Sequence, residues 1–475
     1  MIPVGAGTAS ADPSTCGNAE RRDRCRETME LGRGLFPAPR RPSARICVRG
    51  RRARGSDLRR HAIAAPRRSV DPYAVQVAGQ LWPGHGTPTV VRRPGRVPAG
   101  AARDWWVLPS AGHARMLVPV GHPTAARMLT RHGGGRAQRV ARALLARGVR
   151  TGALAALPVP RLRVATADDT ATCSLEAVLG DLLGTPVATG VLLGTPRVNR
   201  KPVVQVFDPT GRTVAFVKVG TDDATRRLVR RESANLARLQ AAGLTLVQPP
   251  EVLLAGPLGD LELLVLSPLA SSQQERSSAP PLPLEAMAEV AAVSVPQRLA
   301  LASTPFWQSV QRAAAGLDGA GGSRMRDLVG RVDVRWGAST VVTGSWHGDW
   351  APWNMGLLDG RVQVWDWERF DVAGLWGLDV VHFAAQRVRH AAPDAASAER
   401  SLLQEVPVLV ASLAPHGRDQ DPTLLVVAYL AALALRLNCG DSDGDAGGPV
   451  PATGHPRALW ALRLAERLVA EDARG

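Results

Sequence analysis

The order of predicted strands and helices in the middle of the chain restricts its fold. Five segments are rich in β-branched and apolar residues and are separated by turn-like sequences. They span 187–194, 202–207, 213–219, 251–255 and 261–266. A helical pattern at 224–242 separates the third segment from the fourth, and a short amphipathic helix at 174–183 precedes the first. This order predicts an antiparallel sheet that carries a helix.

The part of the chain after residue 269 has a different character, because helical patterns dominate it. A Ser/Pro-rich loop at 270–283 marks the change, and a Gly/Asp-rich linker at 440–454 precedes the last helix. One strand-like segment, 356–367, carries Asp359-Gly360 as a hairpin turn. The predicted helices span 284–293, 305–315, 379–389, 398–413, 423–438 and 455–471. We therefore expect an α+β fold in which a small antiparallel sheet with one helix precedes a mainly helical unit.

The first 70 residues differ from the rest in charge. They contain 16 Arg against 6 Asp or Glu, a net charge of +10 that leaves only +6 of the formal +16 for the other residues. We interpret this segment as a solvated, disordered tail, or as translated sequence upstream of the true start. An arm that binds nucleic acid or a membrane surface is the alternative, but only one aromatic residue, Phe36, lies among the arginines, so we do not expect nucleic acid as a partner.

The predicted organisation has four parts. They are the tail at 1–70, an accessory segment at 71–173, the sheet unit at 174–268 and the helical unit at 269–475. The accessory segment mixes short strands with a helix, and the sequence assigns it no role.

Membrane spans and metal or disulfide frameworks are not expected. The apolar run at 424–435 has twelve residues, whereas a span needs about 20. No secretory signal is visible, so we expect a cytoplasmic protein. Five scattered cysteines, without a Cys-x-x-Cys pair, argue against a disulfide framework and a zinc finger.

Lysine is rare in this chain. Of 58 basic side chains only Lys201 and Lys218 are lysine. Lysine offers a compact ammonium charge, which some phosphate sites need. Neither lysine is followed by Ser or Thr, which excludes a P-loop.

Residues 347–354 contain the pattern that carries chemistry. They read His-Gly-Asp-Trp-Ala-Pro-Trp-Asn, and Asp-Trp-Glu follows at 366–368. Phosphoryl transfer needs a carboxylate that orients the acceptor and oxygen ligands for Mg²⁺. Asp349 fits the first role, and Asn354 with Asp366 fits the second. Lys218, at the end of the third strand, is placed to meet nucleotide phosphates, and Glu232 on the next helix is placed to hold it.

These motifs resemble those of the aminoglycoside phosphotransferase and choline kinase family, within the protein-kinase-like superfamily. The signature His-Gly-Asp-x-x-x-x-Asn is met at 347–354 and the metal motif at 366–368, and the resemblance covers about 175–475. It implies a two-lobed fold, with an N-lobe at 174–268 and a helical C-lobe that holds the catalytic loop. It also implies a Mg²⁺-dependent transfer of a γ-phosphate to a small molecule.

The resemblance also implies where the nucleotide binds. We expect it between the lobes near Ser267 to Leu269. The first hairpin lacks a Gly-x-Gly-x-x-Gly sequence, so phosphate contacts would fall to Thr195, Arg197, Asn199 or Lys201. We expect His347 and Asp379 to support the site rather than to react.

The leading hypothesis is a kinase that uses ATP or GTP and a hydroxyl acceptor. A catalytically idle, kinase-like binding protein is the alternative, although none of Lys218, Asp349, Asn354 and Asp366 is missing. The acceptor stays open among a sugar, a choline-like alcohol and other metabolites, because a fold does not determine a substrate. The sequence does not predict an oligomeric state.

Overall fold

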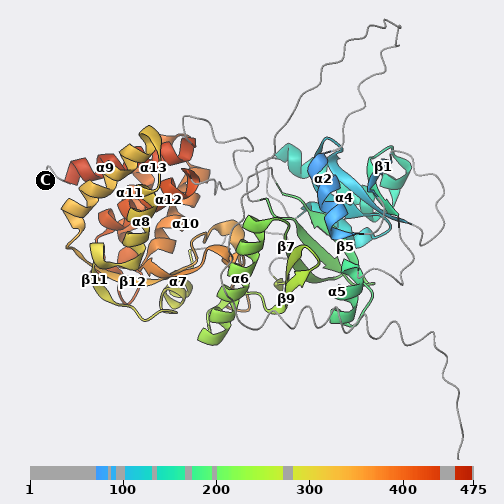
Figure 1. The fold of residues 1–475 in the computed structure, drawn as a ribbon, viewed down its shortest axis with the longest axis horizontal. Helices are drawn as coiled ribbons and strands as arrows, with labels where there is room; N and C mark the ends of the chain where they lie inside the picture. The colour runs from blue at the N-terminus through green and yellow to red at the C-terminus, as the bar shows by residue number, and fades with distance from the viewer. Residues whose placement is uncertain are drawn as a thin grey trace, which may run out of the picture.

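The computed structural model describes residues 71–83, 87–91, 102–130, 136–165, 174–194, 200–270, 282–438 and 455–472. Figure 1 shows one part built on a large sheet and another built mainly from helices, with α6 (Asp223–Ala242) lying between them. The predicted combination of an antiparallel sheet with many helices is confirmed. The tail at 1–70, the linker at 440–454 and most of the loop at 270–283 lie outside the described residues.

The large sheet has nine strands, and every neighbouring pair in it is antiparallel. Its central strands are buried on both faces, because Val204 and Val206 of one strand belong to one hydrophobic cluster and Phe207 of the same strand belongs to another. In spatial order the strands are β1 (Thr89–Val91), β4 (Arg161–Ala165), β2 (Ala102–Ser110), β3 (His113–Pro119), β5 (Ala188–Leu192), β6 (Val203–Phe207), β7 (Thr213–Gly220), β10 (Leu261–Leu266) and β9 (Val252–Leu258).

This sheet corrects the prediction of a small sheet preceded by a separate accessory segment. Strands β1 to β4 come from 71–173, and β3 pairs with β5 across the predicted boundary. The paired residues are Met116 with Leu192 and Leu117 with Val191. The edge strand of a sheet has unpaired backbone groups, and local sequence does not show which strand covers them. The accessory segment and the predicted N-lobe therefore form one sheet.

The sheet lobe, residues 71–270, contains the two helices predicted at 174–183 and 224–242 together with helices of the accessory segment. Its helices are α2 (Pro72–Leu81), α3 (Arg127–Thr130), α4 (Arg136–Arg150), α5 (Leu175–Leu183) and α6. Helix α6 begins with a capping box between Asp222 and Thr225, and it ends at Gly243, whose φ is 65°. A left-handed glycine after the last turn is a common way to end a helix.

The helical lobe matches the predicted helices closely, with one addition. Its helices are α7 (Leu284–Ala291), α8 (Pro305–Ala315), α9 (Gly319–Trp336), α10 (Leu378–Ala391), α11 (Ala395–Ala411), α12 (Pro422–Asn438) and α13 (Pro456–Asp472). Helix α9 was not predicted, because the glycines in its first turn weaken the helical pattern. Helix α12 is buried along most of its length. Within the described residues, no helix has the length and hydropathy that a membrane span requires.

Two small sheets lie beside these helices, where a single hairpin was predicted. One contains β11 (Arg298–Ala300), β12 (Thr340–Trp346) and β15 (Asp371–Leu375), and the other contains β13 (Met355–Leu358), β14 (Arg361–Val364) and β8 (Val247–Gln248). Asp359 and Gly360 have positive φ angles of 51° and 77°, which suit a tight hairpin turn.

The pairing of these strands brings two loops together. The loop at 347–354 leaves β12 and enters β13, and the loop at 365–370 leaves β14 and enters β15. Since β12 pairs with β15 and β13 pairs with β14, the two loops leave the strands at the same end. The strands thus place both sequence motifs side by side.

Candidate functional site

The first motif loop is fixed at its start by α10. Asp379, in the first turn of this helix, accepts hydrogen bonds from the backbone N–H groups of His347 (2.7 Å) and Gly348 (3.1 Å). Burial of this side chain raises its pKa to about 7, although the two N–H donors oppose the shift. Gly348 has a φ of 80°, and a Cβ there would lie 2.9 Å from the carbonyl oxygen of Arg369. A glycine is therefore required at this turn.

His347 connects the two loops. Its Nδ1 accepts a hydrogen bond from the Asp349 N–H (3.1 Å), so its Nε2 carries the proton that it donates to the Trp365 carbonyl oxygen (3.1 Å). The ring is fully buried, and burial lowers its pKa to about 4. His347 is therefore a neutral brace between the loops.

Asp349, near the start of the first loop, and Asn354, its last residue, contact each other. The Asn354 Nδ2 donates to the backbone oxygen of Asp349 (2.9 Å) and to its Oδ2 (3.2 Å). The Asp349 side chain keeps 22% of its surface exposed, so a solute can reach it. Burial would raise its pKa, but a hydrogen bond from His382 and the charges of nearby arginines hold the pKa below its usual range.

Lys218 meets two carboxylates at the boundary between the lobes. Its Nζ lies 2.6 and 2.8 Å from the two oxygens of Glu232, which is fully buried. It also donates a hydrogen bond to Asp366, whose side chain is 43% exposed. Burial alone would lower the pKa of Lys218, but the two carboxylates raise it above its usual range. The same contact lowers the pKa of Asp366 against the effect of burial.

Helix α6 holds the second motif loop directly. Glu232 accepts a hydrogen bond from the Trp367 N–H (3.1 Å). Asn235, one turn later, donates to the carbonyl oxygens of Trp367 (2.9 Å) and Phe370 (3.1 Å). Asn235 was not identified from the sequence, although its position three residues after Glu232 places it on the same helix face. The helix therefore fixes the lysine and the Asp366 loop together.

Lys201 pairs with Glu368, the second carboxylate of the Asp-Trp-Glu motif. Their side chains are 6% and 17% exposed. Glu368 was not identified from the sequence as a partner for lysine. Both lysines of the chain thus contact carboxylates of the 366–368 motif. Lys218 pairs with Asp366, its first residue, and Lys201 pairs with Glu368, its last residue.

The base of the loop before Lys201 is held by Arg200. Its guanidinium donates to the carbonyl oxygens of Leu193 (2.6 Å) and Ala114 (3.0 Å), and it lies 4.0 Å from the centre of the Tyr73 ring. Ala114 and Tyr73 belong to the accessory segment, so that segment contributes to the position of Lys201. Thr195, Arg197 and Asn199 lie outside the described residues.

Ser267 and Leu269 do not join the charged cluster. They follow β10, in which Leu264 pairs with Lys218 of β7. The Ser267 N–H donates to the Glu251 carbonyl oxygen, and the Ser267 Oγ accepts from the Glu251 N–H, both at 2.9 Å. Leu269 is 5% exposed. The two residues therefore lie in the segment that leaves the sheet lobe, one strand away from Lys218.

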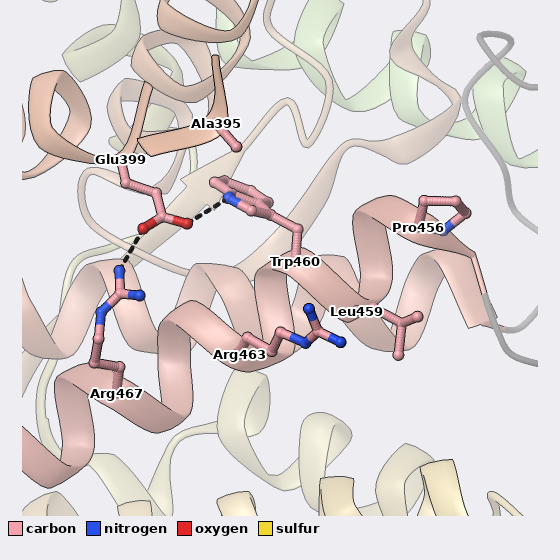
Figure 2. A pocket seen from close by; sticks show the side chains of 7 residues that line it. All are labelled: Ala395, Glu399, Pro456, Leu459, Trp460, Arg463 and Arg467. Carbon is pink, nitrogen blue, oxygen red and sulfur yellow. Dashed lines mark hydrogen bonds and ion pairs between the residues drawn. The ribbon is translucent and has the colours of Figure 1, made fainter. Parts of the chain in front are cut away.

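A separate pocket of about 470 Å³ lies between α11 and α13. Figure 2 shows Glu399 directed toward Trp460 and Arg467, with which it makes a hydrogen bond and an ion pair. None of the residues that line this pocket belongs to either motif. We assign it to the packing of the two helices.

Among solved structures, the chain is similar to several kinases and phosphotransferases of small molecules. A thermostable mutant of the aminoglycoside phosphotransferase APH(4)-Ia has 15% identity and a TM-score of 0.39, and the match covers 63% of this chain and 100% of that one. A choline/ethanolamine kinase family protein from Mesorhizobium loti has 16% identity and a TM-score of 0.34, covering 59% and 92%. A glucosamine kinase has 16% identity and a TM-score of 0.26, covering 60% and 89%. No protein-family model and no curated protein matches the sequence.

Proposed function

We propose that the protein is a small-molecule kinase that transfers the γ-phosphate of ATP or GTP to a hydroxyl group. One observation carries the proposal. Lys218 and Glu232 from the sheet lobe meet Asp366 from the other lobe, and the loop that contains Asp349 is hydrogen-bonded to the loop that contains Asp366. Phosphoryl transfer consists mainly of positioning and charge neutralisation, and this cluster supplies both.

Each side chain has a distinct role in the proposal. Lys218, held by Glu232, binds nucleotide phosphate oxygens. Lys201, which lies beside Glu368, binds phosphate oxygens as well. Asp349 accepts the proton of the acceptor hydroxyl while the acceptor oxygen bonds to the γ-phosphorus and the bond to the leaving β-phosphate oxygen breaks. The nucleotide base would lie near Ser267 and Leu269.

The donor set fits Mg²⁺. Asn354 and Asp366 would hold the ion with one amide and one carboxylate oxygen, and Mg²⁺ commonly takes one or two such ligands together with phosphate oxygens and water. Across the described residues, no group of three or more His, Cys, Asp and Glu side chains is arranged to hold a metal by itself. When bound, the Mg²⁺ ion neutralises charge on the transferring phosphate.

The test uses two variants and a matched control. Asp359 and Asp366 are the described non-glycine residues with a positive φ, at 51° and 68°, and Asn tolerates this conformation. Asp366→Asn therefore removes the charge without disturbing the backbone, and Asp359→Asn makes the same change on the exposed hairpin turn. Asp349→Asn removes the proposed base.

The measurements are titrations of ATP and GTP with and without Mg²⁺, together with phosphate transfer to a panel of hydroxyl metabolites and slow hydrolysis with water as acceptor. We expect Asp349→Asn to keep Mg-nucleotide affinity and lose about 10²- to 10⁴-fold in transfer. Asp366→Asn should lose the Mg²⁺-dependent part of binding, and Asp359→Asn should match the parent. A parent that binds Mg-nucleotide but transfers nothing would instead favour the catalytically idle alternative.

A further inference from the structure

A buried histidine lies against the carboxylate of Asp349. His382 is on α10, one turn after Asp379, and has no exposed surface. Its Nε2 lies 3.3 Å from the Asp349 Oδ1. Since Asp379 binds the start of the loop, two successive turns of α10 contact the loop at two points.

The other ring nitrogen of His382 is also engaged. Its Nδ1 lies 3.2 Å from the hydroxyl oxygen of Tyr429, on α12, which is 2% exposed. An ionised carboxylate such as Asp349 only accepts hydrogen bonds, so the ring presents Nε2–H to it. The Nδ1 then accepts, and the Tyr429 O–H donates. One tautomer of the ring satisfies both contacts.

Gln386, one turn further along α10, lies against the same ring nitrogen. Its Nε2 lies 3.4 Å from the His382 Nε2, and its buried Oε1 has no hydrogen-bond partner among the described residues. Turning the amide by 180° places Oε1, an acceptor, near the ring N–H. In that orientation Oε1 shares the Nε2–H with Asp349, and the contact between two donors is removed.

We propose that His382 is a positioning residue for phosphoryl transfer, which donates its Nε2–H to Asp349 Oδ1 while Tyr429 holds its Nδ1. The proposal rests on the proposed function. His382 then holds Oδ1 and Asn354 holds Oδ2, and Oδ2 keeps a second lone pair that takes the proton of the acceptor hydroxyl. His382 itself exchanges no proton with the acceptor. The low pKa of Asp349, to which the His382 hydrogen bond contributes, agrees with this contact.

Substitutions can separate positioning from packing. His382→Leu keeps much of the ring volume but removes the N–H donor, whereas His382→Gln offers an amide N–H near the position of Nε2. Tyr429→Phe removes only the hydroxyl that holds Nδ1. His113→Leu is the matched control, because His113 is exposed on β3, outside both motif loops.

The experiment measures kcat and KM for hydrolysis of Mg-ATP by the full chain. We expect His382→Leu to lower kcat by about 10- to 100-fold, as loss of orientation does, with little change in KM. His382→Gln should recover part of the loss, Tyr429→Phe should cause a smaller loss, and His113→Leu should match the parent. An unchanged kcat in His382→Leu, or equal losses with Leu and Gln, would overturn the proposal.

A second measurement separates this proposal from the proposed function. Nitrogen-15 NMR of the histidine rings, assigned with the His382 variants, should show His382 protonated at Nε2, and Asp349→Asn should shift that signal. A His382 protonated at Nδ1 would contradict the geometry whatever the activity. A parent without Mg-ATP binding or turnover would contradict the proposed function instead, and a role in transfer would fall with it.

Discussion

Lys201 and Glu368 form an ion pair that joins the sheet lobe to the Asp-Trp-Glu motif of the other lobe. Lys218 makes a similar contact with Asp366, which lies two residues before Glu368 in the same motif. A chain with 56 arginines has only these two lysines, and both lie at the same site. An ammonium is a point charge that leaves one carboxylate for another anion more readily than a bidentate guanidinium does. Nucleotide phosphates would compete with these carboxylates for the same two cations.

The first prediction concerns lysine reactivity. An acyl phosphate of ATP, which transfers its acyl group to an amine beside the phosphates, should label Lys201 or Lys218, and excess Mg-ATP should prevent it. Glu368→Gln should increase labelling of Lys201, because its ammonium no longer pairs with the Glu368 carboxylate. Glu399→Gln, a similar change between α11 and α13, is the control. Peptide mass spectrometry measures the result, and labelling that is insensitive to ATP would contradict a phosphate site.

The second prediction concerns the buried pair of Lys218 and Glu232. Lys218→Met leaves the Glu232 carboxylate without its cation, and loss of one partner of a buried pair typically costs about 3 to 5 kcal/mol. The double variant Lys218→Met/Glu232→Gln should recover much of this free energy of unfolding while activity stays absent. Urea unfolding of the two single variants and the double variant measures it. Additive losses would show that the two side chains do not interact.

The third prediction concerns pH. The pKa of Asp379 is raised to about 7, so the folded state holds this proton more tightly than the unfolded chain. Its stabilising contribution is present below about pH 4, the ordinary pKa of Asp, and is lost as the pH rises toward 7. The pKa of His347 is lowered to about 4, so its contribution is present above about pH 6.5 and is lost as the pH falls. Between about pH 4 and 6.5 the stabilising contribution of Asp379 therefore falls as the pH rises, whereas that of His347 rises.

Asp379→Asn should remove the pH dependence of stability that comes from Asp379 and leave the one that comes from His347. The free energy of unfolding of this variant, relative to the parent, should therefore rise between about pH 4 and 7 and stay constant above that range. Urea unfolding at several pH values measures the difference, with Asp359→Asn as a control that should parallel the parent. A difference that does not change with pH would mean that Asp379 has the same pKa in both states.

The fourth prediction concerns the N-terminal part. Deleting residues 1–70 should leave folding and Mg-nucleotide binding intact, because it keeps Asp71, which hydrogen-bonds to the backbone of Ala111 and Ala114 and caps α2. Deleting 1–83 also removes α2, whose Val77 and Leu81 are buried under the sheet, and should abolish cooperative unfolding. Thermal unfolding distinguishes the two chains. Equal behaviour of both would mean that α2 adds nothing to the stability of the core.

The sequence by itself determined the local elements and the order of the motif residues. Strands β5 to β7, helix α6 and the hairpin at Asp359-Gly360 follow from patterns that extend over a few residues, where side-chain periodicity and turn chemistry act directly. The roles expected of Asp349, Asn354 and Asp366 came from their spacing and from the family resemblance. The spacing also placed Lys218 and Glu232 on adjacent elements, where they pair.

Only the tertiary structure decided which distant segments meet. The pairing of β3 with β5, the ion pair of Lys201 with Glu368, and the contacts of Asn235 and His382 each join residues far apart in the chain. No local pattern contains such contacts, because any edge strand can accept a partner and any buried polar side chain needs one. Which partner is chosen depends on how the sheet, α6 and α10 pack around the two motif loops.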